Sequence, residues 1–71
     1  MKKKIAIEGM SCSHCVSHVK EALSEFEGVT EVNVNLESKT DILESLSDIK
    51  DEAIQFAIED AGYGVVGIEV L

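Results

Sequence analysis

The sequence lacks arginine, proline and tryptophan altogether, and only two of its 71 residues are cysteines. All six basic residues are lysines, and against 14 acidic residues they leave a formal net charge of -8. Such a chain cannot neutralise a row of phosphates, so a nucleic acid is not an expected partner. No hydrophobic run approaches the roughly 20 residues of a membrane-spanning helix, and Met1–Glu8 lacks the apolar stretch of a secretory signal. We therefore expect a cytoplasmic protein that does not insert into a membrane.

What the chain does contain is an ordinary globular composition, with 45% hydrophobic and 28% charged residues. No linker or low-complexity segment interrupts it, so we expect residues 1–71 to form a single domain. A core of this size leaves room for one compact functional site. The only basic cluster, Lys2–Lys4, is interpreted as a solvated chain start, with a docking surface as the alternative.

Hydrophobic periodicity predicts four strands and two helices, because alternating apolar residues indicate strands and spacings of three and four indicate helices. The residues expected to face the core are Ile5 and Ile7 in a first strand; Val16, Val19, Leu23 and Phe26 in a first helix; Val32, Val34 and Leu36 in a second strand; Ile49, Ala53, Ile54, Ala57, Ile58 and Ala61 in a second helix; and Val66, Ile68 and Val70 in a last strand. The expected helix stops are Gly28 and Gly62, and the expected cap of the second helix is Ser47 or Asp48.

Residues 40–45 predict a short edge strand between the second strand and the second helix. The pattern does not decide which side of this strand faces the core, because Asp41, Leu43 and Ser45 fit that side as well as Thr40, Ile42 and Glu44 do. The element order is then βαββαβ, and two amphipathic helices are covered most economically by packing on one face of a four-stranded antiparallel sheet. We predict this α+β, ferredoxin-like arrangement.

The two cysteines, Cys12 and Cys15, stand at C-x-x-C spacing where the first strand hands over to the first helix. In a reducing compartment this spacing indicates a metal or redox pair rather than a structural disulfide. Cys15 is expected in the first helical turn, where free backbone N–H groups favour a thiolate. Two soft sulfur ligands suit Cu(I), whereas Zn²⁺ usually takes four ligands. From Gly9 to Lys20 there is no carboxylate to attract a hard ion such as Mg²⁺.

At these residues the sequence resembles the heavy-metal-associated domain family, which includes bacterial copper chaperones and the metal-binding domains of copper-transporting P-type ATPases. The resemblance covers nearly the whole chain. It rests on Gly9-Met10-Ser11-Cys12-Ser13-His14-Cys15-Val16, on Ala22-Leu23, on Gly28-Val29 with Val32-Asn33-Val34, and on Ala57-Ile58-Glu59-Asp60-Ala61-Gly62-Tyr63. It implies the same fold, Cu(I) carried by Cys12 and Cys15, and transfer by thiolate exchange to a docked partner such as a copper-transporting P-type ATPase domain.

The resemblance also implies roles for the neighbours of the cysteines. Met10 becomes a buried support of the loop, and Tyr63 a residue of the facing loop that shields the site. The small Ser11 favours copper over zinc. His14 is interpreted as a partly exposed tuning residue rather than a ligand, and His18 as a surface histidine.

The family usually places a small apolar residue at the position of Asp41. Because an unpaired carboxylate is costly to bury, we expect either a shift of strand register or a side chain turned to solvent there.

Four functional hypotheses follow, and the first is preferred. In the first, the chain is a non-enzymatic Cu(I) chaperone, expected as a monomer, with a metal-bridged dimer as the alternative. In the second, it is a metal-binding domain of a copper-transporting ATPase. In the third, it carries Zn²⁺ or Hg²⁺. The fourth is a thiol-disulfide oxidoreductase, which also has C-x-x-C at a helix start. As a family feature, such enzymes have a longer chain than this one and a cis-proline beside the active site. This sequence has no proline, which argues against the fourth hypothesis.

Overall fold

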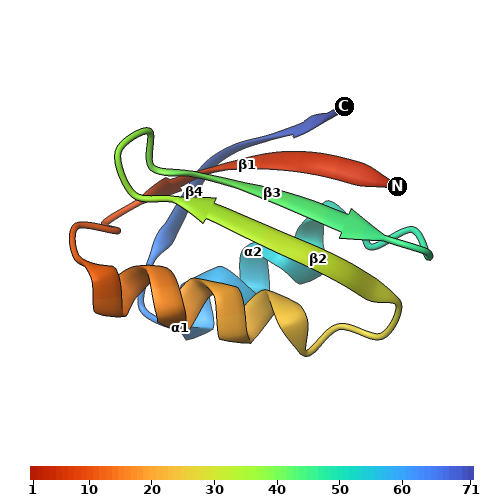
Figure 1. Cartoon of the computed structure of the whole chain (residues 1–71), viewed down its shortest axis with the longest axis horizontal. Coiled ribbons are helices and arrows are strands. Elements are labelled where there is room, and N and C mark those ends of the chain that lie inside the picture. Colours follow the sequence, from red (N-terminus) through yellow and green to blue (C-terminus); the bar gives the residue numbers. More distant parts are fainter.

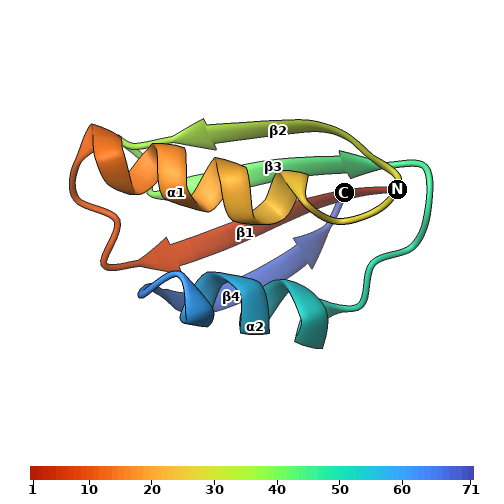
Figure 2. The same ribbon diagram turned by 90° about the horizontal axis from the view of Figure 1, so that it is seen from below.

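The computed structural model describes all residues, 1–71, as four strands and two helices. In chain order they are β1 (Lys2–Glu8), α1 (Ser13–Ser24), β2 (Val29–Asn35), β3 (Thr40–Ser45), α2 (Asp51–Asp60) and β4 (Gly64–Val70). The sheet has the order β2-β3-β1-β4, and every neighbouring pair is antiparallel. Both helices lie on the same face of this sheet (Figures 1 and 2). The predicted ferredoxin-like fold is confirmed.

The core lies between the sheet and the two helices and is built from the predicted apolar positions. Its ten buried residues are Ile5, Ile7, Met10, Val19, Leu23, Val32, Leu43, Ile49, Ile54 and Ile58. Val16, Phe26, Val34 and Ala53 pack against it while partly exposed. Leu36 was predicted to face the core, but it lies beyond the end of β2 and is 37% exposed. Neither helix is long and apolar enough to cross a membrane.

Strand β3 is central rather than at an edge, contrary to the prediction. It pairs with β1 on one side and with β2 on the other, so the edges are β2 and β4. The reason is that the connection through α1 leaves space for one strand between β1 and β2. Strand β3 fills that space and pairs with both. Its inward face carries Asp41, Leu43 and Ser45, all buried.

Asp41 therefore lies inside the protein, and both expectations for it were wrong. It stands between Ile5 and Val34 in regular register and is 0% exposed. The only irregularity of the β2–β3 ladder is at the other end, between Val29 and Glu31. Neither carboxyl oxygen has a hydrogen-bond partner, and burial raises the pKa from 3.8 to about 7. The central position of β3 leaves this side chain no path to solvent, and protonation limits the cost of its burial.

The last strand does not keep the predicted alternation of Val66, Ile68 and Val70. Ala6 pairs with Gly67 and Ile7 with Val65, so Val66 is an extra residue in a β-bulge. The bulge reverses the side of the sheet that successive residues face. As a result Val65 and Ile68 pack against the core, whereas Val66 is 70% exposed. Val70 lies on the same face as Ile68, but it is at the end of the edge strand and is 69% exposed.

Helix α2 begins later than predicted, at Asp51, and its N-cap is Lys50 with no side-chain cap. Ser47 and Asp48 lie before it. Instead of a cap, a lysine from the sheet lies at this end: the Lys3 Nζ donates hydrogen bonds of 2.6 Å to the Ile49 carbonyl and to the Asp51 carboxylate.

Lys3 is only 6% exposed, so the interpretation of Lys2–Lys4 as a solvated chain start is wrong for its middle residue. Alternation along β1 turns Lys3 to the inner face, while Lys2 and Lys4 stay on the exposed one.

Candidate metal centre

The cysteines lie in the loop that joins β1 to α1. Gly9 begins this loop with a φ of +89°, a conformation that other residues adopt only with strain. Met10 then enters the core with 0% exposure, as predicted for a support of the loop. The backbone of Cys12 is extended and forms the N-cap of α1, and the Cys12 carbonyl accepts the Val16 N–H at 3.2 Å. The loop is thus held at both ends, by a buried methionine and by the helix.

Both thiols are free and close together. The Sγ atoms of Cys12 and Cys15 lie 2.8 Å apart in a hydrogen bond, with Cys12 exposed and Cys15 partly exposed. Cys15 is in the first turn of α1, as predicted, and no acidic residue occupies that turn. The structure therefore places two free sulfur atoms side by side near the surface, at the start of α1.

The environment of Cys15 favours its thiolate. Its pKa is lowered from 9.0 to about 6, first by the hydrogen bond from the Cys12 side chain and then by hydrogen bonding from the Tyr63 hydroxyl. The backbone of the loop contributes as well, through Ser11 and Cys12. The lowered pKa favours the thiolate form of Cys15 at neutral pH.

Tyr63 comes from the loop between α2 and β4, which lies at the same end of the molecule as the cysteine loop (Figure 2). The chain reaches this loop through Gly62, whose φ is +100°, while the Tyr63 N–H donates to the Ile58 carbonyl at 3.1 Å. The aromatic ring passes over Gly9, where an added Cβ would lie 3.8 Å from it. Hydrogen bonding to Cys15 raises the pKa of Tyr63 to about 12. The predicted position of Tyr63 beside the site is confirmed.

His18 was interpreted as a surface histidine, and it is exposed, yet it also belongs to this group of side chains. Its Nδ1 lies 3.2 Å from the Tyr63 hydroxyl oxygen. The sequence does carry a signal for this contact, since His18 is three residues after Cys15 and so lies one helical turn further along α1. His14 is exposed, and no hydrogen bond joins its side chain to the cysteines.

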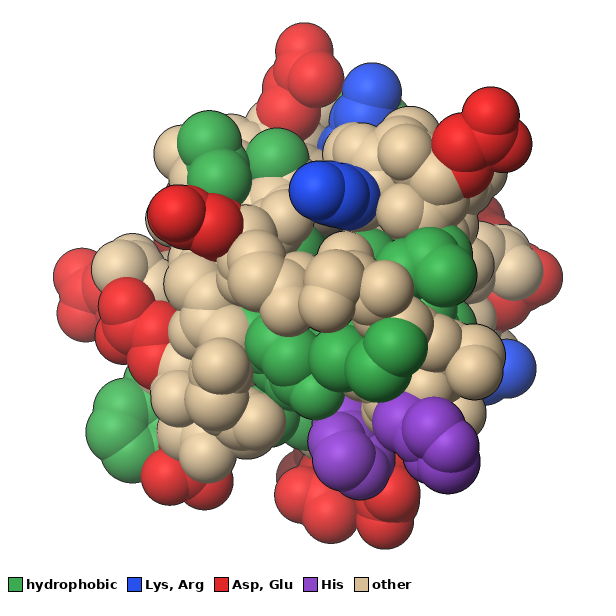
Figure 3. Space-filling model, turned by 90° about the vertical axis from the view of Figure 1, so that its left-hand side faces the viewer, with side chains coloured by type: hydrophobic (Ala, Val, Ile, Leu, Met, Phe, Trp, Pro, Cys, Tyr) green, Lys and Arg blue, Asp and Glu red, His purple; other side chains and the backbone are tan.

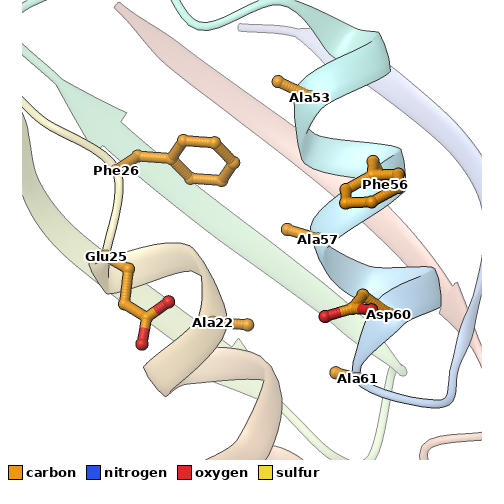
Figure 4. A pocket seen from close by; sticks show the side chains of 8 residues that line it. All are labelled: Ala22, Glu25, Phe26, Ala53, Phe56, Ala57, Asp60 and Ala61. Atoms are coloured by element: carbon orange, nitrogen blue, oxygen red, sulfur yellow. The ribbon is translucent and has the colours of Figure 1, made fainter.

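Figure 3 views the molecule from this end. Hydrophobic side chains, which in its colouring include cysteine and tyrosine, form a patch in the middle, with the two histidines beside it and acidic residues around the margin. The roomiest hollow of the surface lies elsewhere, between the helices, with a volume of about 460 Å³. Phe26 and Phe56 line it together with four alanines, and Glu25 and Asp60 lie at its border (Figure 4). No cysteine takes part in it.

The chain belongs to the heavy-metal-associated domain family, whose model matches residues 4–64. Over 65 residues it is 43% identical to the copper chaperone CopZ of Bacillus subtilis, covering 90% of this chain and 94% of that protein. It is 40% identical over 63 residues to the copper-transporting ATPase 1 of Rhizobium meliloti, covering 89% of this chain but 8% of the ATPase. A solved CopZ metallochaperone superposes with a TM-score of 0.86 at 40% identity, covering 93% of this chain and all of the other.

Proposed function

We propose that the chain binds Cu(I) through Cys12 and Cys15 and passes the ion to a partner protein, without catalysing a reaction. The observation that carries this proposal is the pair of free, surface thiols at the start of α1, one of them with its pKa lowered to about 6. The chain's similarity to a copper chaperone, at 43% identity, supports the choice of metal.

The ligand set favours a soft ion of low coordination number. Thiolates select soft metals, and no group of three or more His, Cys, Asp or Glu side chains stands together to hold an ion. Zn²⁺ usually needs four such ligands. A metal–sulfur bond of about 2.3 Å places two sulfurs about 4 Å or more apart when they lie on opposite sides of an ion. The thiols must therefore separate from 2.8 Å, and the exposed Cys12 is free to move outwards.

Transfer would proceed by exchange of thiolates. A partner thiolate bonds to the two-coordinate ion, one of the two cysteines then leaves, and the ion is never released into water. The partial exposure of Cys15 and the full exposure of Cys12 support this step, because an incoming sulfur needs access to the ion. We propose a copper-transporting P-type ATPase domain, or a similar acceptor, as the partner. With a net charge of -8, docking would be favoured by a basic surface on that partner.

We further propose that residues 1–71 act as one domain, a cytoplasmic chaperone that is monomeric until it meets metal or partner. A metal-binding domain of a copper-transporting ATPase is the alternative, supported by the 40% identity to such an enzyme.

The test is an anaerobic titration of the reduced protein with Cu(I) against a chromogenic chelator, with Zn²⁺ in parallel. Cys15→Ser is expected to weaken Cu(I) binding by more than about a hundredfold, because loss of one of two linked ligands removes the chelate. Cys12→Ala serves as the second variant. Equal Cu(I) affinity in the wild type and both variants, or displacement of Cu(I) by Zn²⁺, would overturn the proposal.

A further inference from the structure

The chain has two histidines, His14 and His18, and they stand four residues apart on α1. In a helix this spacing brings the two Cβ atoms to about 5–6 Å of each other on one face. Both side chains are exposed, and Figure 3 shows them next to each other at the surface. His18 is also a neighbour of Cys15, one helical turn away, whereas Cys15 is partly buried and packs against the core.

The second observation concerns the orientation of His18. The His18 Nδ1 lies 3.2 Å from the Tyr63 hydroxyl oxygen, and a hydrogen bond joins the two groups. In the tautomer that carries its hydrogen on Nδ1, the hydroxyl oxygen accepts this bond and Nε2 keeps a free lone pair. Histidines that bind metals usually have this arrangement, with the other ring N–H donated to a neighbouring group that fixes the ring.

We propose that His14 and His18 form a second metal site, for a borderline divalent cation such as Zn²⁺, oriented by the Tyr63 hydroxyl and separate from the thiol pair. Paired histidines at this helical spacing are a known zinc-binding arrangement. Imidazole suits borderline divalent ions better than it suits the hard ions, and the surrounding negative charge favours any cation. No third side chain completes the site, so its other positions are open to water or to a group from a docked partner.

The experiment uses the full chain with Cys12→Ser and Cys15→Ser, so that no thiol competes for the probe. This parent is titrated with Zn²⁺ by calorimetry, above the pKa of free imidazole, and the histidine ring resonances are followed by NMR. One equivalent should bind, with shifts at both rings. His14→Gln or His18→Gln should weaken the affinity by about a hundredfold, because each leaves one ligand of the pair.

A matched control keeps two histidines but separates them. In the parent, His18→Gln combined with Ser24→His moves the second ring about 9 Å along the helix, from one exposed position of α1 to another. It should bind as weakly as His18→Gln alone. If this variant or either single variant binds Zn²⁺ as tightly as the parent, the ion sits on surface carboxylates and the proposal is wrong. No binding by the parent would overturn it as well.

Tyr63→Phe tests whether the Tyr63 hydroxyl orients the His18 ring for metal binding. Removing the hydroxyl should weaken Zn²⁺ binding by about tenfold, the usual effect of losing a group that orients a ligand. Unchanged affinity would show that Tyr63 does not orient the site. Because the parent has no thiols, none of these results depends on the Cu(I) titration of the wild type, and either proposal can fail alone.

Discussion

Cys15 and Asp41 are two acids in one small fold whose surroundings move their pKa values in opposite directions. The pKa of Cys15 falls from 9.0 to about 6, whereas that of Asp41 rises from 3.8 to about 7. Cys15 lies partly exposed at a helix start among hydrogen-bond donors. Asp41 lies under the helices with no donor at all. Hydrogen bonding to the charged form decides the first case, and desolvation decides the second.

The comparison shows that exposure alone does not set the charge state. An acid at the surface can be tuned by donors to remain an anion at neutral pH, which suits a ligand for a cation. A buried acid of the same chain is neutral at mildly acidic pH, and it costs stability increasingly as the pH rises from 3.8 to about 7. Three of the four predictions below alter one side of this comparison, and the other tests a buried charge that has partners.

The largest expected effect is on stability, from Asp41→Val. Between pH 3.8 and about 7 the folded chain keeps a proton that the unfolded chain has released, so its stability falls as pH rises. At about 1.4 kcal/mol per pH unit, the loss by pH 8 is about 4 kcal/mol. Asp41→Val should recover this stability and remove that part of the pH dependence, in denaturant unfolding at pH 5 and pH 8.

The informative quantity is the difference between wild type and variant, because it cancels the other carboxylates. Asp41→Asn is the control, since it has the same size and no charge but keeps a buried polar group. It should flatten the pH dependence while recovering less stability than Asp41→Val. If Asp41→Val leaves the slope between pH 5 and pH 8 as it is, Asp41 is not the titrating group.

The next effect is on Cys15, from Cys12→Ala. The Cys12 side chain is the foremost cause of the low pKa of Cys15, so its removal should raise that pKa towards 9, and by more than removal of the Tyr63 hydroxyl does. The variant has one thiol, and its rate of alkylation as a function of pH reports the pKa directly. Ala6→Ser, distant in sequence and on β1, serves as the control with both thiols. A pKa that stays near 6 in Cys12→Ala would assign the effect to the helix and Tyr63 instead.

A third, smaller effect comes from Lys3, a buried charge that has partners where Asp41 has none. Lys3→Met removes the donor to the Ile49 carbonyl, and a buried acceptor without a partner costs about 1–2 kcal/mol. Asp51 is 56% exposed in its side chain and can be hydrated instead. Lys4→Met, on the exposed face, should change the free energy of unfolding by less than about 0.5 kcal/mol. Equal losses from both substitutions would contradict this difference between them.

The parts of the fold that sequence predicts are those set by local pattern. Spacings of three and four placed Val19, Leu23, Ile54 and Ile58 in the core, and the C-x-x-C spacing placed Cys15 in the first turn of α1. These features need only the periodicity of the chain and the helix start. The resemblance to the family added Tyr63, which no local pattern could have brought to the cysteines.

The features that sequence did not predict depend on contacts between distant segments. The bulge at Val66 is a property of the β1–β4 ladder, and the burial of Asp41 follows from β3 being central. The buried Lys3 finds its partners 46 and 48 residues away. His18 meets Tyr63 across 45 residues. Alternation gives the two faces of a strand, but the neighbours of that strand decide which face is buried.

The smallest effect should come from Tyr63→Phe, which keeps the ring over Gly9 and removes only the hydroxyl. Tyr63 ranks after Cys12 among the causes that lower the pKa of Cys15, so that pKa should rise less than in Cys12→Ala. Cu(I) affinity should change by less than about threefold, because no ligand is lost. The thiolate pKa can be followed by absorbance, and the affinity by the chelator competition. If Tyr63→Phe weakened Cu(I) binding more than Cys15→Ser does, the two sulfurs would not be the ligands, and the hydroxyl would have to be one.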